Sequence, residues 1–368
     1  EPALGFFDRG LDDFLGVAIF IEPHHPNRFR DLPAQDETAL SRFGQWTGAG
    51  MLQVLLPLLL ILLAAPAIAS ERERGTLRLL AAQGVRPGEL LLGKALGIAA
   101  AVAGVLAPAL LAALAVALAS PARASLSAAR VALLLVGYAL YLGAFLLASL
   151  AISARARTAQ GAVVAALSLW SLTVLLGPRL VAEAAGRLAP SPTAFDFQQA
   201  LEAGTLNHDE AAREAHDAEL LRRTLARYGV SKADELPVNL AGIRLQDQED
   251  HDAPHFDRVY GELFGTFAAQ ERLTTWGALA APLLAVQSVS MAAAGTDGAH
   301  AADFWLAAER HRRTMVTTLN RFITAHPVKG GPYGLTADRE AWDLVPPFAY
   351  APPPARFALD HALAPLGV

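Results

Sequence analysis

The sequence predicts a mainly α-helical protein that crosses a membrane several times and carries a large, mostly helical extracytoplasmic domain. Two observations support this prediction. Residues 43–178 contain four uncharged stretches rich in Leu and Ala, and each can cross about 30 Å of hydrocarbon at about 1.5 Å per helical residue. Residues 179–368 instead contain most of the Asp, Glu and His residues. The second half of the chain is therefore predicted to face water.

The elements follow in order along the chain. Residues 1–42 are polar and interrupted by prolines, and the chain starts at Glu1. We expect them to form an extracytoplasmic segment after a first span that lies outside this sequence. Residues 43–178 then form four transmembrane helices, and residues 179–368 form the extracytoplasmic domain that leads to a last span. The four predicted spans are residues 43–70, 95–121, 131–154 and 158–178.

Residues 71–94 orient these spans. This loop holds five basic residues, whereas the segments before and after the third span hold two each. Short loops rich in Lys and Arg stay in the cytoplasm. With 71–94 inside, span parity places residues 1–42 and 179–368 outside. The five basic residues are Arg72, Arg74, Arg78, Arg86 and Lys94.

The same loop has helix signals. Gly75 allows the chain to turn, residues 76–83 fit a short helix that ends at Gly84, and Pro87 with Glu89 suits the first turn of a second helix. Two short helices at a membrane surface form a lever that a soluble motor can push. The alternative is an ordinary interfacial loop whose Arg side chains reach lipid phosphates.

Three pieces of the loop carry a family resemblance: residues 71–78 (ERERGTLR), 84–87 (GVRP) and 93–94 (GK). They resemble the loop motif of ABC-2 type transporter permeases. Residues 6–29 and 284–320 resemble one branch of that family, whose members carry a domain of unknown function, DUF3526, and large extracytoplasmic insertions.

The resemblance implies a function. It predicts the permease subunit of a bacterial exporter in the cytoplasmic membrane, with six spans in the complete protein. Two permease copies would assemble with two ATP-binding cassette subunits, which bind ATP and Mg²⁺, so this chain itself needs no cofactor and has no catalytic residue. The implied ATPase-coupling residues are Glu71, Arg72, Glu73, Arg74, Gly75, Thr76, Leu77, Arg78, Arg86, Pro87 and Lys94.

Two other functions stay open. The chain can be a mechanotransmitter, in which ATP hydrolysis works the outer domain on a periplasmic partner without transport. It can also anchor a periplasmic metal-binding or enzyme domain that has no motor. His251 and His255 are weak metal-ligand candidates, because Pro254 argues against the continuous helix that would place them on one face. No hydrolase motif supports a catalytic domain.

Several features exclude other readings. A net charge of −5 leaves no nucleic-acid footprint, and the absence of cysteine removes disulfides and thiolate chemistry. Residues 88–95 match the GxxxxGK pattern of a phosphate-binding loop. However, Ala95 replaces the Mg²⁺-binding hydroxyl, and no strand precedes the motif.

A few expectations concern single elements. The uncharged residues 273–296 are predicted to be a buried or interfacial helix, with a fifth span as the alternative. Asn207 with Glu210 resembles a capping box that opens a helix ending at Gly229. Tyr138, Tyr141 and Trp170 are predicted to be interface anchors. An apolar stripe is predicted at Phe304, Ala308, His311, Met315, Thr318 and Phe322.

Overall fold

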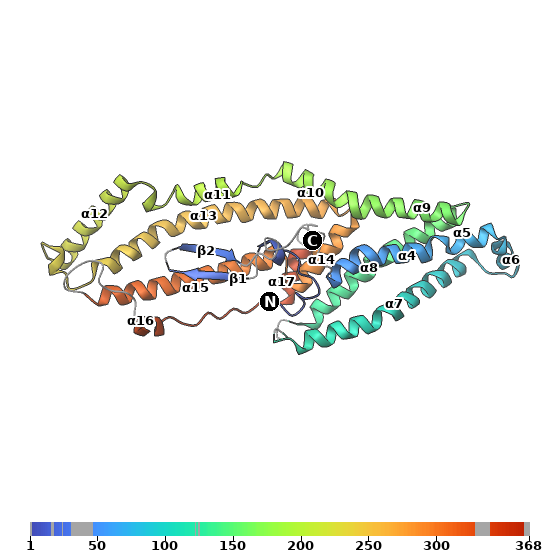
Figure 1. Cartoon of the computed structure of the whole chain (residues 1–368), viewed down its shortest axis with the longest axis horizontal. Coiled ribbons are helices and arrows are strands. Elements are labelled where there is room, and N and C mark those ends of the chain that lie inside the picture. The colour runs from blue at the N-terminus through green and yellow to red at the C-terminus, as the bar shows by residue number, and fades with distance from the viewer. Residues whose placement is uncertain are drawn as a thin grey trace.

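The computed structural model describes residues 2–15, 18–23, 25–30, 47–121, 123, 126–327 and 339–363. It confirms the predicted mainly α-helical fold. The molecule is elongated, with a bundle of apolar helices at one end and a set of long polar helices at the other (Figure 1). Both ends of the described chain lie near the middle, where the two halves meet (Figure 1).

Four helices in the described part of the chain are long and apolar enough to cross a membrane. We call them spans 1 to 4: Gly48–Glu73, Pro87–Ala119, Ala128–Arg155 and Ala159–Leu188. Each contains most of one predicted stretch and continues beyond it, because helices extend through polar flanking residues.

Spans 1 and 4 consist of shorter elements, because prolines and π-helical turns interrupt the regular helix, whereas spans 2 and 3 are single helices. Span 1 combines α3 (Gly48–Gly50), the π-helical η2 (Met51–Leu55), α4 (Leu56–Ala64) and α5 (Pro66–Glu73). Span 2 is α7 (Pro87–Ala119), and span 3 is α8 (Ala128–Arg155). Span 4 combines α9 (Ala159–Trp170), the π-helical η4 (Ser171–Leu176) and α10 (Gly177–Leu188). The short helix α6 (Thr76–Ala82) lies between spans 1 and 2.

Small residues hold the bundle together. Ala65 and Ala69 of span 1 and Ala162 and Ala166 of span 4 are buried in one cluster with Tyr138 of span 3. In hydrocarbon, burying an apolar side chain gains little over contact with lipid, so close packing and interhelical hydrogen bonds supply the stability. Span 2 is the least buried of the four spans, with 11% of its most apolar residues inside the protein.

The remaining elements form what we call the helical extension. Its helices are α11 (Ala194–Glu202), α12 (Glu210–Tyr228), α13 (Leu240–Gly277), α14 (Pro282–Ala294), α15 (Gly298–Ala325), α16 (Arg339–Asp343) and α17 (Ala355–Leu363). Two 3₁₀ turns join them, η5 (Leu206–His208) and η6 (Ala233–Glu235). Near the N-terminus, α1 (Asp12–Leu15) precedes an antiparallel hairpin of β1 (Ala18–Glu22) and β2 (His25–Arg30) that lies beside α15.

Two local predictions about the extension are wrong. The N-cap of α12 is Asp209 rather than Asn207, because the Asp209 carboxylate accepts hydrogen bonds from the first backbone N–H groups of the helix. Pro254 does not interrupt α13, which runs unbroken for 38 residues. A proline inside a helix costs about 3 kcal/mol, and the packing of α13 along α15 offsets that cost.

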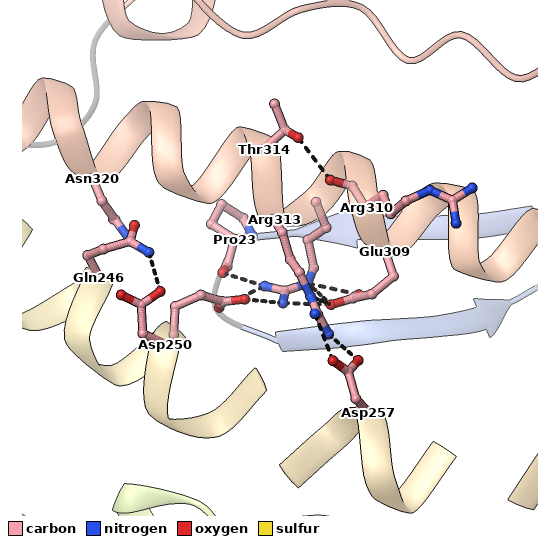
Figure 2. Close-up of polar contacts among 11 residues, drawn as sticks. Pro23, Gln246, Asp250, Asp257, Glu309, Arg310, Arg313, Thr314 and Asn320 are labelled. Carbon is pink, nitrogen blue, oxygen red and sulfur yellow. Dashed lines mark hydrogen bonds and ion pairs between the residues drawn. The ribbon is translucent and has the colours of Figure 1, made fainter. Parts of the chain in front are cut away.

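Helices α13 and α15 pack along their lengths and hold the extension together (Figure 1). Some of their contacts are aromatic: the centres of the Tyr260 and Trp305 rings lie 4.3 Å apart. Others are ionic. Arg312 is 2% exposed and pairs with Glu309 and with Glu249 of α13, and Arg313 points from α15 to Asp257 of α13 (Figure 2). Buried charges persist only when such partners satisfy them.

The ionic network changes the predicted face of α15. The most buried residues include Trp305, Glu309, Arg312, Leu319 and Ile323, whereas the predicted stripe member His311 is half-buried against Phe348. Met315 and Ala308 of the stripe are buried as predicted. The predicted stripe is therefore partly wrong. The buried face of α15 contains Glu309 and Arg312, and a search for apolar positions at helical spacing leaves such charged residues out.

Residues 273–296 form no single helix of spanning length. The last turn of α13, a turn at residues 278–281 and the 13-residue α14 share them. Leu283 and Val286 of α14 are buried against the spans, chiefly α8. The structure therefore agrees with a buried or interfacial helix and does not support a fifth span here.

Candidate functional site

Residues 71–94 form two helices joined by tight turns, as the sequence predicts. Gly75 has φ +79° and precedes α6, and Gly84 has φ +85° and follows it. These positive φ values favour glycine. The Val85 N–H bonds the Leu80 carbonyl, which closes the end of α6. Pro87 and Glu89 then open α7, where the Glu89 carboxylate accepts a hydrogen bond from the Arg86 N–H.

Glu71 joins the two ends of the loop. Its carboxylate accepts a hydrogen bond from the Thr76 hydroxyl at the start of α6 and one from Lys94 Nζ of α7 at 3.0 Å. The chain therefore closes on itself where it leaves span 1 and enters span 2. The loop cannot hinge freely about Gly75 while these bonds hold.

Arg72 and Glu73 attach the loop to the other two spans. The Arg72 guanidinium donates to carbonyls at the C-terminal end of α8, including Ala154 at 2.6 Å. The Glu73 carboxylate accepts the Ala159 N–H at the start of α9, at 3.1 Å. A cation at a helix C-terminus and an anion at an N-terminus are both favourable. The first three motif residues thus connect span 1 to spans 2, 3 and 4.

The rest of the motif faces outward. Helix α6 has no buried residue, and Leu79 on it is 64% exposed. Arg74, Arg78 and Arg86 are also exposed, and Leu77 is half-buried. The motif therefore has two parts. Glu71, Arg72, Glu73 and Lys94 tie the loop to the spans, with Thr76 bonded to Glu71. Arg74, Arg78 and Arg86 lie on or beside the uncovered helix α6.

Residues 88–95, which match the sequence pattern of a phosphate-binding loop, do not have the backbone geometry of one. These residues are regular helix within α7, and Lys94 pairs with Glu71. A phosphate-binding loop instead needs a curved backbone whose N–H groups point at one centre.

The two candidate metal ligands both lie on α13 but take other partners. His255 contacts the Ala200 carbonyl at 2.8 Å and Arg258 at 3.1 Å, and His251 packs its ring against His216. In the described part of the chain, no three His, Asp or Glu side chains are grouped to hold a metal. The sequence contains a second pair of histidines, His24 and His25, but His24 lies outside the described residues and His25 is described only in its backbone.

A hollow of about 480 Å³ opens between α11, α13 and α15. Its charged lining residues include Glu249 and Arg312, which already pair with each other. Burial opposes ionisation of Arg312, but its hydrogen bonds with Glu309 and Glu249 raise the pKa of its guanidinium. This arginine is thus a fixed structural cation.

Sequence reasoning missed the junction between the spans and the extension. Arg130, at the start of α8, is 5% exposed. Its guanidinium donates to the carbonyls of Ala292 and Ala293 at 3.1 Å each and of Pro353 at 2.9 Å, and it contacts His300 Nε2 at 3.1 Å. One side chain therefore joins α8 to α14, to the start of α15 and to the segment before α17.

A buried polar chain lies next to it. Asp8 accepts a hydrogen bond from Ser290 of α14, whose hydroxyl lies 3.1 Å from that of Tyr138. The Gln53 side-chain amide of η2 donates to the Tyr138 oxygen at 2.9 Å, and the Gln53 backbone carbonyl accepts a hydrogen bond from the Tyr141 hydroxyl at 2.7 Å. The prediction that the two tyrosines are interface anchors is wrong, because these internal partners satisfy their hydroxyls inside the bundle.

The fold and the loop together define a class: a multi-pass helical membrane protein with one motif-built surface loop. Residues 13–207 match the family described as ABC-2 family transporter protein, and residues 194–351 match the domain of unknown function DUF3526. The first match covers more than half of the chain, so the protein belongs to the ABC-2 transporter family. Among curated proteins and among solved structures, no match was found.

Proposed function

We propose that this chain is the permease subunit of a bacterial ABC exporter and that α6 is the surface on which a separate ATP-binding subunit docks. Membership of the ABC-2 family supports a permease subunit. The observation that carries the docking proposal is the uncovered helix α6 on a frame tied to all four spans.

The contacts suggest how force enters the bundle. A subunit that moves α6 also moves Glu71, Arg72 and Glu73, which bond Lys94 of span 2, the end of span 3 and the start of span 4. ATP-driven closure of the motor would thus shift all four spans together between two arrangements. The ATP and Mg²⁺ would be bound by the partner. Two permease copies, with a substrate path between them, complete the proposal.

The proposed topology places residues 71–94 in the cytoplasm and the helical extension outside the bacterial cytoplasmic membrane. The concentration of basic residues in the loop supports it. The proposed domains are residues 1–42 outside, 43–178 in the membrane and 179–368 outside, and α10 continues the helix of span 4 beyond residue 178 to Leu188. Cysteine at Gln83 and at Ala233, both exposed, should label from opposite sides with an impermeant thiol reagent. Labelling of both from one side contradicts the topology.

Mechanotransmission is the second candidate function. The observation that favours it is the junction, where Arg130 and close glycine contacts join the extension directly to the spans. Movement of the spans would then tilt the extension, and α13 would carry that tilt along its 38 residues. The alternative of an anchored enzyme or metal-binding domain has no comparable support.

The experiment is co-expression of this chain with candidate ATP-binding subunits from the same genome, followed by purification and an ATPase assay in lipid. We expect a stable complex whose ATPase rate changes on assembly. Reversing charge at Arg74 and Arg78 should abolish that change. Arg222→Glu, an equally exposed charge reversal on α12, should leave it intact. Equal behaviour of the two variants contradicts docking at α6.

A further inference from the structure

We propose that the turn between α13 and α14 is a second, non-spanning membrane contact, which inserts Trp276 and Leu279 into the lipid interface on the side of the helical extension. This contact goes beyond the proposed function, and it holds whichever side of the membrane is cytoplasmic. The partner surface is the bilayer itself.

The turn has the composition of a lipid-facing segment. Residues 273–296 contain no Asp, Glu, Lys, Arg or His, although they lie within a half of the chain that is rich in charge. Trp276 is 59% exposed and Leu279 is 78% exposed, the highest value among the exposed large apolar side chains described. Leaving large apolar side chains in water forgoes the free energy of their burial. At the membrane–water interface, by contrast, Trp is enriched.

Two close contacts fix the height of the turn along span 4. A Cβ added at Gly177 would lie 2.9 Å from the Ala281 Cβ, and one added at Gly277 would lie 2.3 Å from Val181 Cγ1. The turn therefore lies against residues 177–181 of span 4. This position brackets Arg179, the charge that ends the uncharged stretch.

That height corresponds to the membrane surface. Gly177 is at most about 27 Å of helix from the start of α9 at Ala159, at about 1.5 Å per α-helical residue, and a hydrocarbon core is about 30 Å thick. If the start of α9 lies at one face of the bilayer, residues 177–181 and the turn beside them lie at the other.

The surface of span 4 next to the turn indicates that the bilayer is the partner of the exposed Trp276 and Leu279. Leu172, Leu176 and Leu180 are four residues apart, so they share one helix face, and they are 56%, 53% and 67% exposed. This apolar face on a candidate span faces lipid. The exposed turn adjoins it at residues 177–181, so the same bilayer extends over Trp276 and Leu279.

The contact gives the extension a firm base. Helix α13 runs unbroken from this turn to its other end at Leu240, and the turn is packed on span 4. With both the turn and span 4 held by lipid, α13 cannot rock about span 4 without pulling Trp276 and Leu279 out of the interface.

The test uses the natural absence of cysteine in the chain. A spin label is placed on the full chain, reconstituted in phosphatidylcholine–phosphatidylglycerol vesicles, at Leu279→Cys, Leu172→Cys or Leu188→Cys. All three leucines are exposed. Residue 172 is the lipid-facing control, and residue 188, beyond Arg179 on the same helix, is the water-facing control. Collision rates with oxygen and with a water-soluble nickel chelate are measured.

We expect the ratio of oxygen to nickel collisions at residue 279 to be several-fold higher than at residue 188 and close to that at residue 172. A ratio equal to that at residue 188 places the turn in water and overturns the proposal. Protection from both reagents shows that protein covers the turn and also overturns it. As a second measurement, brominated lipids should quench Trp fluorescence less in Trp276→Phe than in the wild type. Trp342→Phe serves as its control, and quenching equal to the wild type contradicts insertion.

Discussion

The two ends of the span bundle are held by contacts that differ in burial and packing. At the loop end, formed by residues 71–94 and the adjacent ends of α8 and α9, the contacts are hydrogen bonds and one ion pair, and α6 is uncovered. At the junction end, Arg130 is buried and glycines allow backbones and side chains to touch. In the proposed function, the uncovered α6 at the loop end binds a partner subunit, whereas at the junction end the contacts are made within the chain.

This difference assigns different roles to similar residues. At the loop end Arg72, Arg74 and Arg78 are all exposed, but Arg72 binds helix carbonyls whereas Arg74 and Arg78 lie beside and on α6. At the junction end, the buried Arg130 guanidinium donates hydrogen bonds to backbone carbonyls within the chain. Changes at the junction should therefore affect stability first, and changes on α6 should affect coupling first.

The largest expected effect is at Gly277, where an added Cβ would lie 2.3 Å from Val181. Gly277→Ala should lower the free energy of unfolding by about 1–3 kcal/mol, the usual cost of overpacking. Gly261→Ala is the matched control, because that glycine lies in the same helix with open space around it, and it should gain about 0.5–1 kcal/mol. Thermal unfolding of the purified chain measures both. A Gly277→Ala variant as stable as Gly261→Ala contradicts the close contact.

Arg130→Ala should come next. The change leaves the carbonyls of Ala292, Ala293 and Pro353 without their donor, and each buried unsatisfied group costs about 1–3 kcal/mol. Water that enters the space reduces the total, so we expect about 2 kcal/mol. Arg130→Lys should not restore stability, since one ammonium cannot reach all the acceptors. Arg123→Ala, at an exposed arginine, is the control. Full stability of Arg130→Ala refutes the junction role.

The ion pair at the loop end should contribute less. Glu71 and Lys94 are about 26% and 32% exposed, respectively, and such pairs contribute about 0.2–1 kcal/mol. Glu71→Gln should therefore barely change unfolding but should weaken the response of the ATPase partner. The double variant Glu71→Lys with Lys94→Glu should recover part of that response. If Glu71→Gln unfolds the chain, or leaves the response unchanged, the two ends do not differ as described.

The smallest effects concern pH at the junction. Burial raises the pKa of Asp8, despite its bonds from Ser290 and Gly10. Burial opposes ionisation of Asp297 too, but hydrogen bonds and charge from His300 lower the pKa of that carboxyl. Asp8 therefore adds stability below the unfolded pKa of about 3.9 and loses it as the pH rises. Asp297 adds stability above about 3.9 and loses it as the pH falls through its folded value.

The two Asn variants should thus behave oppositely. At pH 7, Asp8→Asn should be as stable as the wild type or more stable, and Asp297→Asn should be less stable, although Asn still caps α15. Below about pH 3.9 both differences should shrink. Unfolding curves from pH 3 to 7 measure them, and parallel behaviour of the two variants contradicts the assignment.

Much of the fold follows from local signals. Four uncharged stretches predicted the spans, and Gly75, Gly84 and Pro87 predicted the limits of α6 and α7, because turn and cap residues act within a few positions. The junction could not be predicted this way. Arg130 bonds Pro353, 223 positions away, and a pattern of charges does not show which arginine finds buried acceptors. The face of α15 was mispredicted for the same reason, since Arg312 is paired from α13.

The site shows the same limit. The motif identified the loop, but it did not show which residues tie the loop to the spans and which stay on its surface. That distinction depends on the ends of α8 and α9, which are distant in sequence from Arg72 and Glu73. His251 and His255 show the reverse case. The sequence made them weak metal-ligand candidates because Pro254 argued against a shared helix. The fold places both on the unbroken α13, but the Ala200 carbonyl and Arg258 contact His255.

The most direct test of the account is a photo-crosslink from α6. A benzoylphenylalanine is placed at Leu79, which is 64% exposed, and for comparison at Phe195, which is 75% exposed on α11. After irradiation of cells that express the chain with the ATP-binding subunit that co-purifies with it, position 79 should give an adduct that contains that subunit, and position 195 should give none. An adduct with the ATP-binding subunit at position 195 but not at 79 would contradict the account.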